Sequence, residues 1–222
     1  GQYQAIEYAG EAVRALSMQE RMTMSNMAAE LGGQVGLIAP DKTTAAFLAN
    51  AGAPEADWSD LQTDEGADLL AHHRFNASTL PPQVAAPHSP ANAMPATEAS
   101  SDVDVAYIGA CTGAKYEDLA AAAAILKGQK IAPGVSIAVA PSSAQDQQRA
   151  TNEGIMKIFE DAGARILPNA CGICAGYGTD RLGAAVTCIS STARNFKGRM
   201  GDPTSQVWLA SPYTVAASAI AG

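Results

Sequence analysis

Short apolar segments alternate with helical segments over the second half of the chain, and this alternation constrains the fold more than any other feature. The expected strands are residues 103–108, 136–140, 165–167, 186–190 and 206–210. The expected helices are residues 116–127, 145–162 and 212–221, the last with a proline in its first turn. Parallel strands need crossover connections, which are usually helical, so the pattern predicts an α/β fold with a mostly parallel sheet covered by helices.

The first 50 residues predict a helix, a strand and a second helix. Residues 17–20 have the capping-box pattern S-x-x-E, and the helix that follows should end at the glycine pair 32–33. Residues 35–39 are typical of a strand. Asp41 is expected to cap a short helix over residues 43–48.

Periodicity fades between residues 52 and about 101. Residues 80–96 hold five of the 12 prolines. A connection of this length in a compact protein is usually functional or interdomain. We therefore expect one domain portion at 1–75, a Pro-rich linker at 76–101 and an α/β domain at 102–222.

The composition is that of a folded, acidic protein. The formal charge is −8, with 14 Lys and Arg against 22 Asp and Glu, and 47% of the residues are hydrophobic. This balance argues against disorder and against a nucleic-acid or acidic-membrane surface as the default partner. The sequence has no apolar run of about 20 residues and begins without signal-peptide features, so we expect a cytoplasmic protein.

Candidate functional residues follow the expected strands. Ligands of open parallel sheets bind outside the carboxyl ends of the strands. The residues that follow four of these strands are Cys111, Cys171, Cys174, Arg194, Arg199 and Ser211. Three thiols and two guanidinium groups would therefore meet at one edge of the sheet.

The residue chemistry leaves several roles open for these cysteines. A C-x-x-C pair with a third cysteine 60 residues earlier suits an iron–sulfur cluster, a Cys₃ zinc site, a redox dithiol or inert thiols. A closed zinc site needs a fourth ligand, from Cys188 or from one of the three histidines at 72, 73 and 88. A redox C-x-x-C should open a helix, which the glycines at 172, 176 and 178 disfavour.

Four segments together resemble the aconitase and isopropylmalate dehydratase family. They are RMTMSNMAAELGGQVGLIAPD at 21–41, YIGACTGAKYEDL at 107–119, LPNACGICAG at 167–176 and SSTARNFKGRMG at 190–201. Their order along the chain also matches that of the family. The resemblance implies aconitase-like three-layer α/β/α domains, with residues 1–75 belonging to a middle domain and 102–222 to the cluster-binding domain.

The resemblance implies a [4Fe–4S] cluster held by Cys111, Cys171 and Cys174. The fourth iron would lack a protein ligand and act as a Lewis acid on a substrate hydroxyl. The implied enzyme is a hydro-lyase that dehydrates and rehydrates a hydroxy di- or tricarboxylic acid. It is most similar to the large subunit of 3-isopropylmalate dehydratase of leucine biosynthesis, and homoaconitate, 2-methylmalate and 2,3-dimethylmalate hydro-lyases are the alternatives within the family.

The resemblance also assigns substrate-binding residues. Arg194 and Arg199 would bind substrate carboxylates, which suits the planar fork of a guanidinium. Asn26 and Glu30, four residues apart on the first helix, would line the active site. Without the resemblance, all four residues would be read as solvated side chains.

The chain departs from the family pattern at two positions. Gly113 follows the first Cys-Thr pair where the family commonly has Asn, and Ala193 precedes the first arginine where the family again has Asn. The ligand cysteines are retained, and the lost amides bear on substrate choice.

The resemblance places further parts of the enzyme outside this chain. The catalytic base, an N-terminal domain and a small subunit or swivelling domain would all lie elsewhere, so this polypeptide alone is expected to be an incomplete enzyme. An alternative of another class is a regulatory iron–sulfur protein that binds RNA, which the charge of −8 weighs against.

Overall fold

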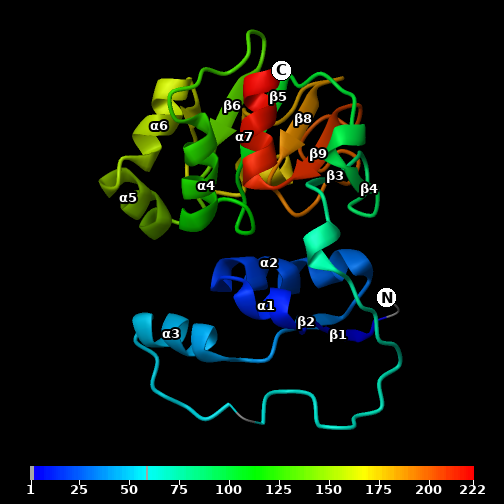
Figure 1. Ribbon diagram of the computed structural model, residues 1–222. Coiled ribbons are helices and arrows are strands. Elements are labelled where there is room, and N and C mark those ends of the chain that lie inside the picture. The colour runs from blue at the N-terminus through cyan, green and yellow to red at the C-terminus, as the bar shows by residue number, and fades with distance from the viewer. Residues whose placement is uncertain (1–2, 59) are drawn as a thin grey trace. The chain divides into compact units, whose positions relative to one another are not determined.

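The computed structural model describes residues 3–58 and 60–222. The chain divides into two compact units, Gly1–Leu80 and Pro81–Gly222 (Figure 1). Each unit is described by itself.

The first unit is built from short helices around a small parallel sheet. Its described elements are β1 (Ala5–Glu7), α1 (Glu11–Ala15), α2 (Met18–Met27), the 3₁₀ helix η1 (Ala28–Leu31), β2 (Val35–Leu37), α3 (Lys42–Asn50) and the 3₁₀ helix η2 (Ala77–Thr79). β1 pairs with β2, and Ile6 lies opposite Gly36. A Cβ atom on Gly36 would lie 2.8 Å from the Cβ of Ala28 and 2.9 Å from the carbonyl oxygen of Ser25. Glycine therefore allows β2 to lie directly against the end of α2.

The expected caps of the first unit are confirmed. The Ser17 hydroxyl accepts a hydrogen bond from the Glu20 N–H at 3.3 Å, and the Glu20 carboxylate accepts one from the Ser17 N–H at 2.8 Å. The Asp41 carboxylate caps α3 by accepting from the backbone N–H groups of Thr43 and Thr44. The helix after Ser17 changes to a 3₁₀ turn at residue 28, so the expected stop near residues 32–33 is reached by η1 rather than by α2 itself.

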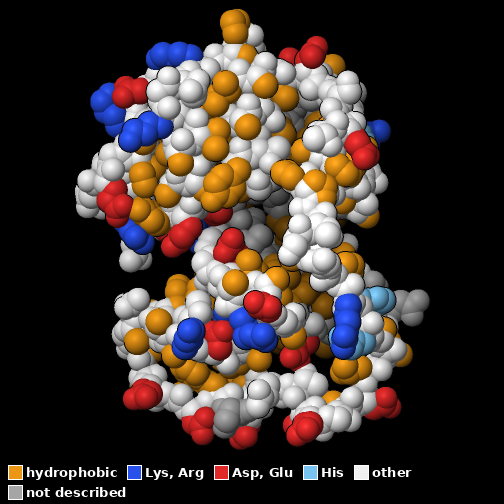
Figure 2. All heavy atoms as spheres, in the orientation of Figure 1, with side chains coloured by type: hydrophobic (Ala, Val, Ile, Leu, Met, Phe, Trp, Pro, Cys, Tyr) orange, Lys and Arg blue, Asp and Glu red, His pale blue; other side chains and the backbone are white. Residues whose placement is uncertain are grey.

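A long loop follows α3. The described residues between 51 and 76 contain no helix or strand. Figure 2 shows acidic side chains along the visible part of this loop. Its acidic residues are Glu55, Asp57, Asp60, Asp64, Glu65 and Asp68.

The second unit is organised around one twisted sheet. Within residues 81–222, all of which are described, the strands are β3 (Gln83–Ala85), β4 (Ala93–Pro95), β5 (Val105–Ile108), β6 (Ser136–Val139), β7 (Arg165–Ile166), β8 (Thr187–Ser190) and β9 (Gln206–Ala210). Their order is β4-β3-β9-β8-β5-β6-β7. The strands from β9 to β7 in this order are parallel, and β3 pairs antiparallel with both β9 and β4. The α/β class with a mostly parallel sheet is therefore confirmed.

Part of the segment expected as a Pro-rich linker joins this sheet. β3 and β4 lie within residues 76–101 and form a hairpin that pairs with β9 through Val84 and Ala85. The short 3₁₀ helix η3 (Ala96–Glu98) follows. The two strands have three residues each and lie among prolines, and β4, which ends in Pro95, is an edge strand. Proline is tolerated at a sheet edge because no ladder bond is lost there, so the proline content concealed the hairpin.

The helices of the second unit pack on one face of the sheet (Figure 1). They are α4 (Tyr116–Leu126), α5 (Ala144–Asn152), α6 (Ile155–Ala162) and α7 (Pro212–Ala221). The helix expected over 145–162 is divided into α5 and α6 because Gly154 adopts φ 76°, a left-handed conformation that ends the first helix. Leu119, Phe159 and Val215 are fully buried between these helices and the sheet.

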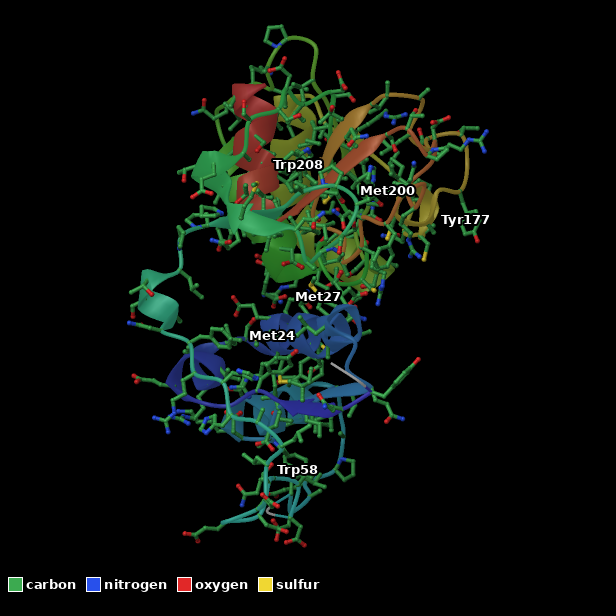
Figure 3. All side chains as sticks on the ribbon, turned by 90° about the vertical axis from the view of Figure 1, so that its right-hand side faces the viewer. Met24, Met27, Trp58, Tyr177, Met200 and Trp208 are labelled. Carbon is green, nitrogen blue, oxygen red and sulfur yellow. The ribbon has the colours of Figure 1, made fainter. Side chains whose placement is uncertain are left out.

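The opposite face of the sheet carries the segments with the cysteines. It is covered by the 3₁₀ helix η4 (Gly172–Ala175) and by side chains from residues 182–200. Tyr107, Ile173, Cys188 and Met200 are buried there. Figure 3 shows Met200 inside this unit and Tyr177 pointing outward. Among the described residues, no helix has the length and apolar character needed to cross a membrane.

Candidate active site

The loop that carries Cys111 follows β5 in a tightly constrained conformation. A Cβ atom on Gly109 would lie 2.2 Å from the ring of Tyr107, so only glycine fits there. Ala110 has φ 75°, an unusual value for a residue with a side chain. Cys111 is exposed at the tip of the turn. Strained backbone of this kind is frequent at functional sites.

Ser191 fixes this loop from the end of the neighbouring strand β8. Its hydroxyl accepts a hydrogen bond from the Gly109 N–H at 3.0 Å and donates one to the Gly113 carbonyl at 2.8 Å. A Cβ atom on Gly113 would lie 2.0 Å from the Ser191 carbonyl oxygen. The glycine at 113, one of the two departures from the family pattern, is therefore required by the close approach of the two loops. Sequence reasoning missed Ser191, whose signal was its place directly after a strand.

Cys171 precedes the η4 turn and Cys174 lies within it. Cys171 is exposed and Cys174 is half-buried. The segment before the turn is anchored by Asn169, whose side-chain amide donates to the carbonyl oxygens of Pro141 at 3.0 Å and Ser143 at 3.3 Å. Both acceptors follow β6, so the turn is fixed to the carboxyl edge of the sheet.

Arg199 contacts Cys174 directly. Its Nε donates a hydrogen bond to the Cys174 carbonyl oxygen at 3.0 Å. Burial raises the pKa of the Cys174 thiol, and the Arg199 guanidinium opposes this rise through a hydrogen bond and its charge. The arginine therefore favours the thiolate, the form in which cysteine binds metals.

The three candidate ligand thiols lie near one another. Cys171 and Cys111 both raise the pKa of Cys174 by charge repulsion. Among residues 3–58 and 60–222, no three Cys, His, Asp or Glu side chains converge tightly enough to hold a single metal ion. In an iron–sulfur cluster each cysteine binds a different iron atom, so its ligands are spread more widely.

Arg194 and Arg199 are half-buried rather than fully solvated. The backbone between them is held by Asn195, which is fully buried. The Asn195 amide donates to the carbonyl oxygens of Ala86 at 2.9 Å and Val207 at 3.0 Å. Sequence reasoning missed Asn195, because one of its partners, Ala86, lies in the hairpin that the sequence pattern concealed.

The two candidate residues of the first unit lie four positions apart. Asn26 is exposed on α2, and Glu30 is half-buried in η1. They belong to a different unit from the cysteines, so the proposed sharing of one active site stays a prediction.

The remaining candidates have structural surroundings. Cys188 is fully buried, burial raises its pKa well above the usual range, and its thiol points to the Ile189 carbonyl. The Ser211 hydroxyl accepts from the Thr214 N–H and caps α7. His72 and His73 are exposed and His88 is half-buried.

The comparisons with known proteins agree with this architecture. Residues 1–222 match the model of the aconitase family (aconitate hydratase). The chain is 42% identical to the 3-isopropylmalate dehydratase large subunit 1 of Pyrococcus furiosus, over 99% of the chain and 52% of that protein. It is 42% identical to the 3-isopropylmalate dehydratase large subunit of Sulfurihydrogenibium sp., over 99% of the chain and 51% of that protein. It is 39% identical to the 3-isopropylmalate dehydratase large subunit 2 of Archaeoglobus fulgidus, over 99% of the chain and 53% of that protein. The chain thus spans about half the length of the curated relatives it matches, and it belongs to the aconitase family.

Proposed function

We propose that the chain is the cluster-bearing portion of a hydro-lyase that removes and adds water at a hydroxy di- or tricarboxylic acid. The observation that carries this proposal is the gathering of Cys111, Cys171 and Cys174 at one edge of the sheet, with Arg199 hydrogen-bonded to Cys174. The named function of the relatives supports the reaction class.

The donor set fits a [4Fe–4S] cluster. Two of the thiols are exposed and the third is half-buried, as ligands of a cluster open to substrate must be. When bound, the cluster would supply an iron without a protein ligand, which acts as a Lewis acid on the substrate hydroxyl.

The chain itself would supply carboxylate binding and orientation. Arg194 and Arg199 lie on one loop after β8, and each can form the bidentate pair with a carboxylate that fixes a substrate in one orientation. Arg199 has a second role, because it also favours the ionised form of Cys174. We propose that Asn26 and Glu30 line the same site from a middle domain at 1–75, with 102–222 as the cluster domain.

The catalytic base and further substrate-binding groups are proposed to come from outside this chain. The relatives are named large subunits, which implies a small subunit as partner. An N-terminal domain is a second proposed partner, and the cytoplasm is the proposed location. The first proposed substrate is 3-isopropylmalate, and homoaconitate, 2-methylmalate and 2,3-dimethylmalate are the alternatives.

Metal analysis after anaerobic purification tests the cofactor. We expect iron and sulfide near four per chain, with loss of both in Cys171→Ser and retention in Cys188→Ala, since Cys188 is buried away from solvent. Stoichiometric zinc, or RNA binding by the cluster-free protein, would contradict the proposal.

Kinetics of the complete enzyme test the substrate role. Arg199→Lys should keep the cluster absorbance and weaken substrate binding by roughly 10- to 150-fold, because a lysine ammonium cannot form the bidentate contact. Arg165→Lys is the matched control, because Arg165 is 65% exposed and pairs with Asp180. Unchanged kinetics in Arg199→Lys would make Arg199 a surface charge, and loss of the cluster would make it structural.

A further inference from the structure

The hydroxyl of Tyr107 is the least explained polar group of the cysteine-bearing face. Tyr107 lies on β5 with its side chain fully buried. Within residues 81–222, all described, its hydroxyl has no hydrogen bond of ordinary geometry. Buried hydroxyl groups are normally paired, because an unpaired one loses its bonds to water without replacement.

The surroundings of this hydroxyl are rich in sulfur. Tyr107 is packed in the same buried cluster as Cys188 and Ile173, with Cys174 against that cluster. The ring also lies over the start of the Cys111 loop, since a Cβ atom on Gly109 would be 2.3 Å from the hydroxyl oxygen. The hydroxyl therefore sits between the loop of Cys111 and the turn of Cys171 and Cys174.

We propose that the Tyr107 hydroxyl donates a hydrogen bond to the Cys174 sulfur once that sulfur is a thiolate ligand of the cluster. This inference rests on the proposed function, because it requires a bound cluster. Tyr107 would then be a positioning residue that contacts the cluster through its ligand, a role that outer-shell groups of metal sites commonly have.

Cys174 is a better acceptor than Cys188. Cys174 packs against the buried cluster that contains Tyr107, and as a thiolate its sulfur would accept a charge-assisted hydrogen bond. The Tyr107 hydroxyl has no hydrogen-bond partner among the described residues, so its O–H is available to donate. The Cys188 thiol stays protonated because burial raises its pKa, and its S–H already points to the Ile189 carbonyl.

A hydrogen bond to a ligand sulfur has measurable effects on a cluster. It stabilises the added negative charge of the reduced state, so it raises the reduction potential. It also favours the bound thiolate, which slows cluster loss. A hydrogen bond to a charged group corresponds to a change of about tenfold or more in an equilibrium constant.

The test compares Tyr107→Phe with the unchanged chain after anaerobic reconstitution with iron and sulfide. Phenylalanine keeps the ring that packs on Gly109 and removes only the hydroxyl. We expect four irons to bind as before, with a more negative reduction potential and about tenfold faster loss of cluster absorbance in the presence of a chelator. Tyr213→Phe is the matched control, because Tyr213 is exposed on α7 and its hydroxyl should not affect the cluster.

The possible outcomes separate this inference from the proposed function. If the unchanged chain binds no cluster, the proposed cofactor is wrong and this inference falls with it. If the unchanged chain binds the cluster but Tyr107→Phe has the same potential and the same loss rate, only the role of Tyr107 is wrong.

A second variant keeps the inference testable if Tyr107→Phe fails to fold. Incorporation of 3-fluorotyrosine at position 107 preserves the ring and hydroxyl and makes the O–H a stronger donor. The reduction potential should then shift in the positive direction, opposite to the shift expected for Tyr107→Phe. An unchanged potential in the fluorinated protein would contradict the hydrogen bond.

Discussion

The two units of the chain are stabilised by different kinds of interaction. Among the described residues of the first unit, 3–58 and 60–80, Ala28 is the one buried hydrophobic side chain, and the polar Gln19 and Arg21 are also buried. The second unit buries large apolar side chains on both faces of its sheet, among them Phe159, Leu119 and Met200. The first unit therefore depends on caps and an ion pair, and the second depends on an apolar core.

This difference predicts opposite sensitivities. Apolar burial responds to loss of volume and is insensitive to pH. An ion pair between partly buried groups responds to pH and to removal of either charge. Substitutions in each unit should therefore distinguish stabilisation by apolar burial from stabilisation by an ion pair. Amide hydrogen exchange can report the stability of each unit individually.

The largest effect on stability should come from the core of the second unit. Phe159→Ala should lower the free energy of unfolding by about 3–5 kcal/mol, because Phe159 is fully buried on α6 and its removal leaves a cavity. Urea unfolding followed by circular dichroism measures the change. Ile125→Ala, at a 37% exposed position on α4, is the control. A loss below about 1 kcal/mol in Phe159→Ala would contradict a tightly packed core.

The ion pair of the first unit should give the next largest effect. Arg21 is 3% exposed and forms two hydrogen bonds with the Asp41 carboxylate, at 2.7 and 2.8 Å. Asp41→Asn would leave this buried guanidinium without its charge partner, so we expect a loss of about 1–3 kcal/mol, confined to the first unit. Hydrogen exchange of the α2 and α3 amides is the measurement. Asp161→Asn, which removes an exposed pair with Lys157, should change stability by less than about 0.5 kcal/mol.

The same pair should make the first unit sensitive to acid. A hydrogen bond from Arg21 lowers the pKa of Asp41 to about 2, against a usual value of about 3.9 in an unfolded chain. A lowered folded-state pKa means that the stabilisation is fully present above about pH 4 and is lost as the pH falls toward 2. Exchange of the α3 amides should accelerate over this range, and Asp41→Asn should flatten that dependence. An equal acid dependence in both proteins would rule out Asp41 as the cause.

Ser191→Ala should have an effect on stability of similar size and, in addition, a specific effect on the site. The change removes the hydrogen-bond acceptor of the buried Gly109 N–H, which costs about 1–3 kcal/mol. It also releases the Cys111 loop, so a bound cluster should be lost faster. Ser205→Ala is a matched control, because Ser205 is also buried and donates to the Asp202 carbonyl oxygen. An equal rate of cluster loss in the two variants would show that Ser191 does not position Cys111.

The strands of the second unit could be predicted because they are buried on both faces. β5 and most of β6 therefore appear in the sequence as apolar runs with little room for alternatives. The β3–β4 hairpin could not be predicted in the same way, since its strands have three residues each and lie among prolines. Short strands at an edge are specified by pairing with β9 rather than by their own pattern.

The candidate site shows a similar limit. The cysteines and arginines were found because they follow strands and lie in recognisable motifs. Ser191 and Tyr107 were not, because their roles depend on contacts that the sequence does not reveal. The bond between Ser191 and Gly109 spans 82 positions along the chain. Close approaches such as that of Gly113 to Ser191 become visible only when the strands are placed side by side.

Cys111→Ala should have the smallest effect on stability among these variants and the largest effect on cluster binding. Cys111 is exposed at the tip of its loop, so Cys111→Ala should change the stability of the metal-free chain by no more than about 0.5 kcal/mol. The same variant should fail to retain a cluster, because the remaining two cysteines cannot replace the third ligand. Cys188→Ala should show the reverse pattern. Cys188 is fully buried, and removal of its sulfur should cost roughly 0.5–1.5 kcal/mol, as for one buried methylene, while the cluster is kept.

Urea unfolding of the metal-free variants and iron analysis of the reconstituted ones measure the two effects separately. Full iron content in Cys111→Ala would remove Cys111 from the ligand set. A decrease in the free energy of unfolding of more than about 2 kcal/mol in metal-free Cys111→Ala would instead show that the thiol stabilises the fold. The expected results would show that the apolar core stabilises the second unit and that the exposed loops bind the cluster. Stability and cluster binding could then be changed independently.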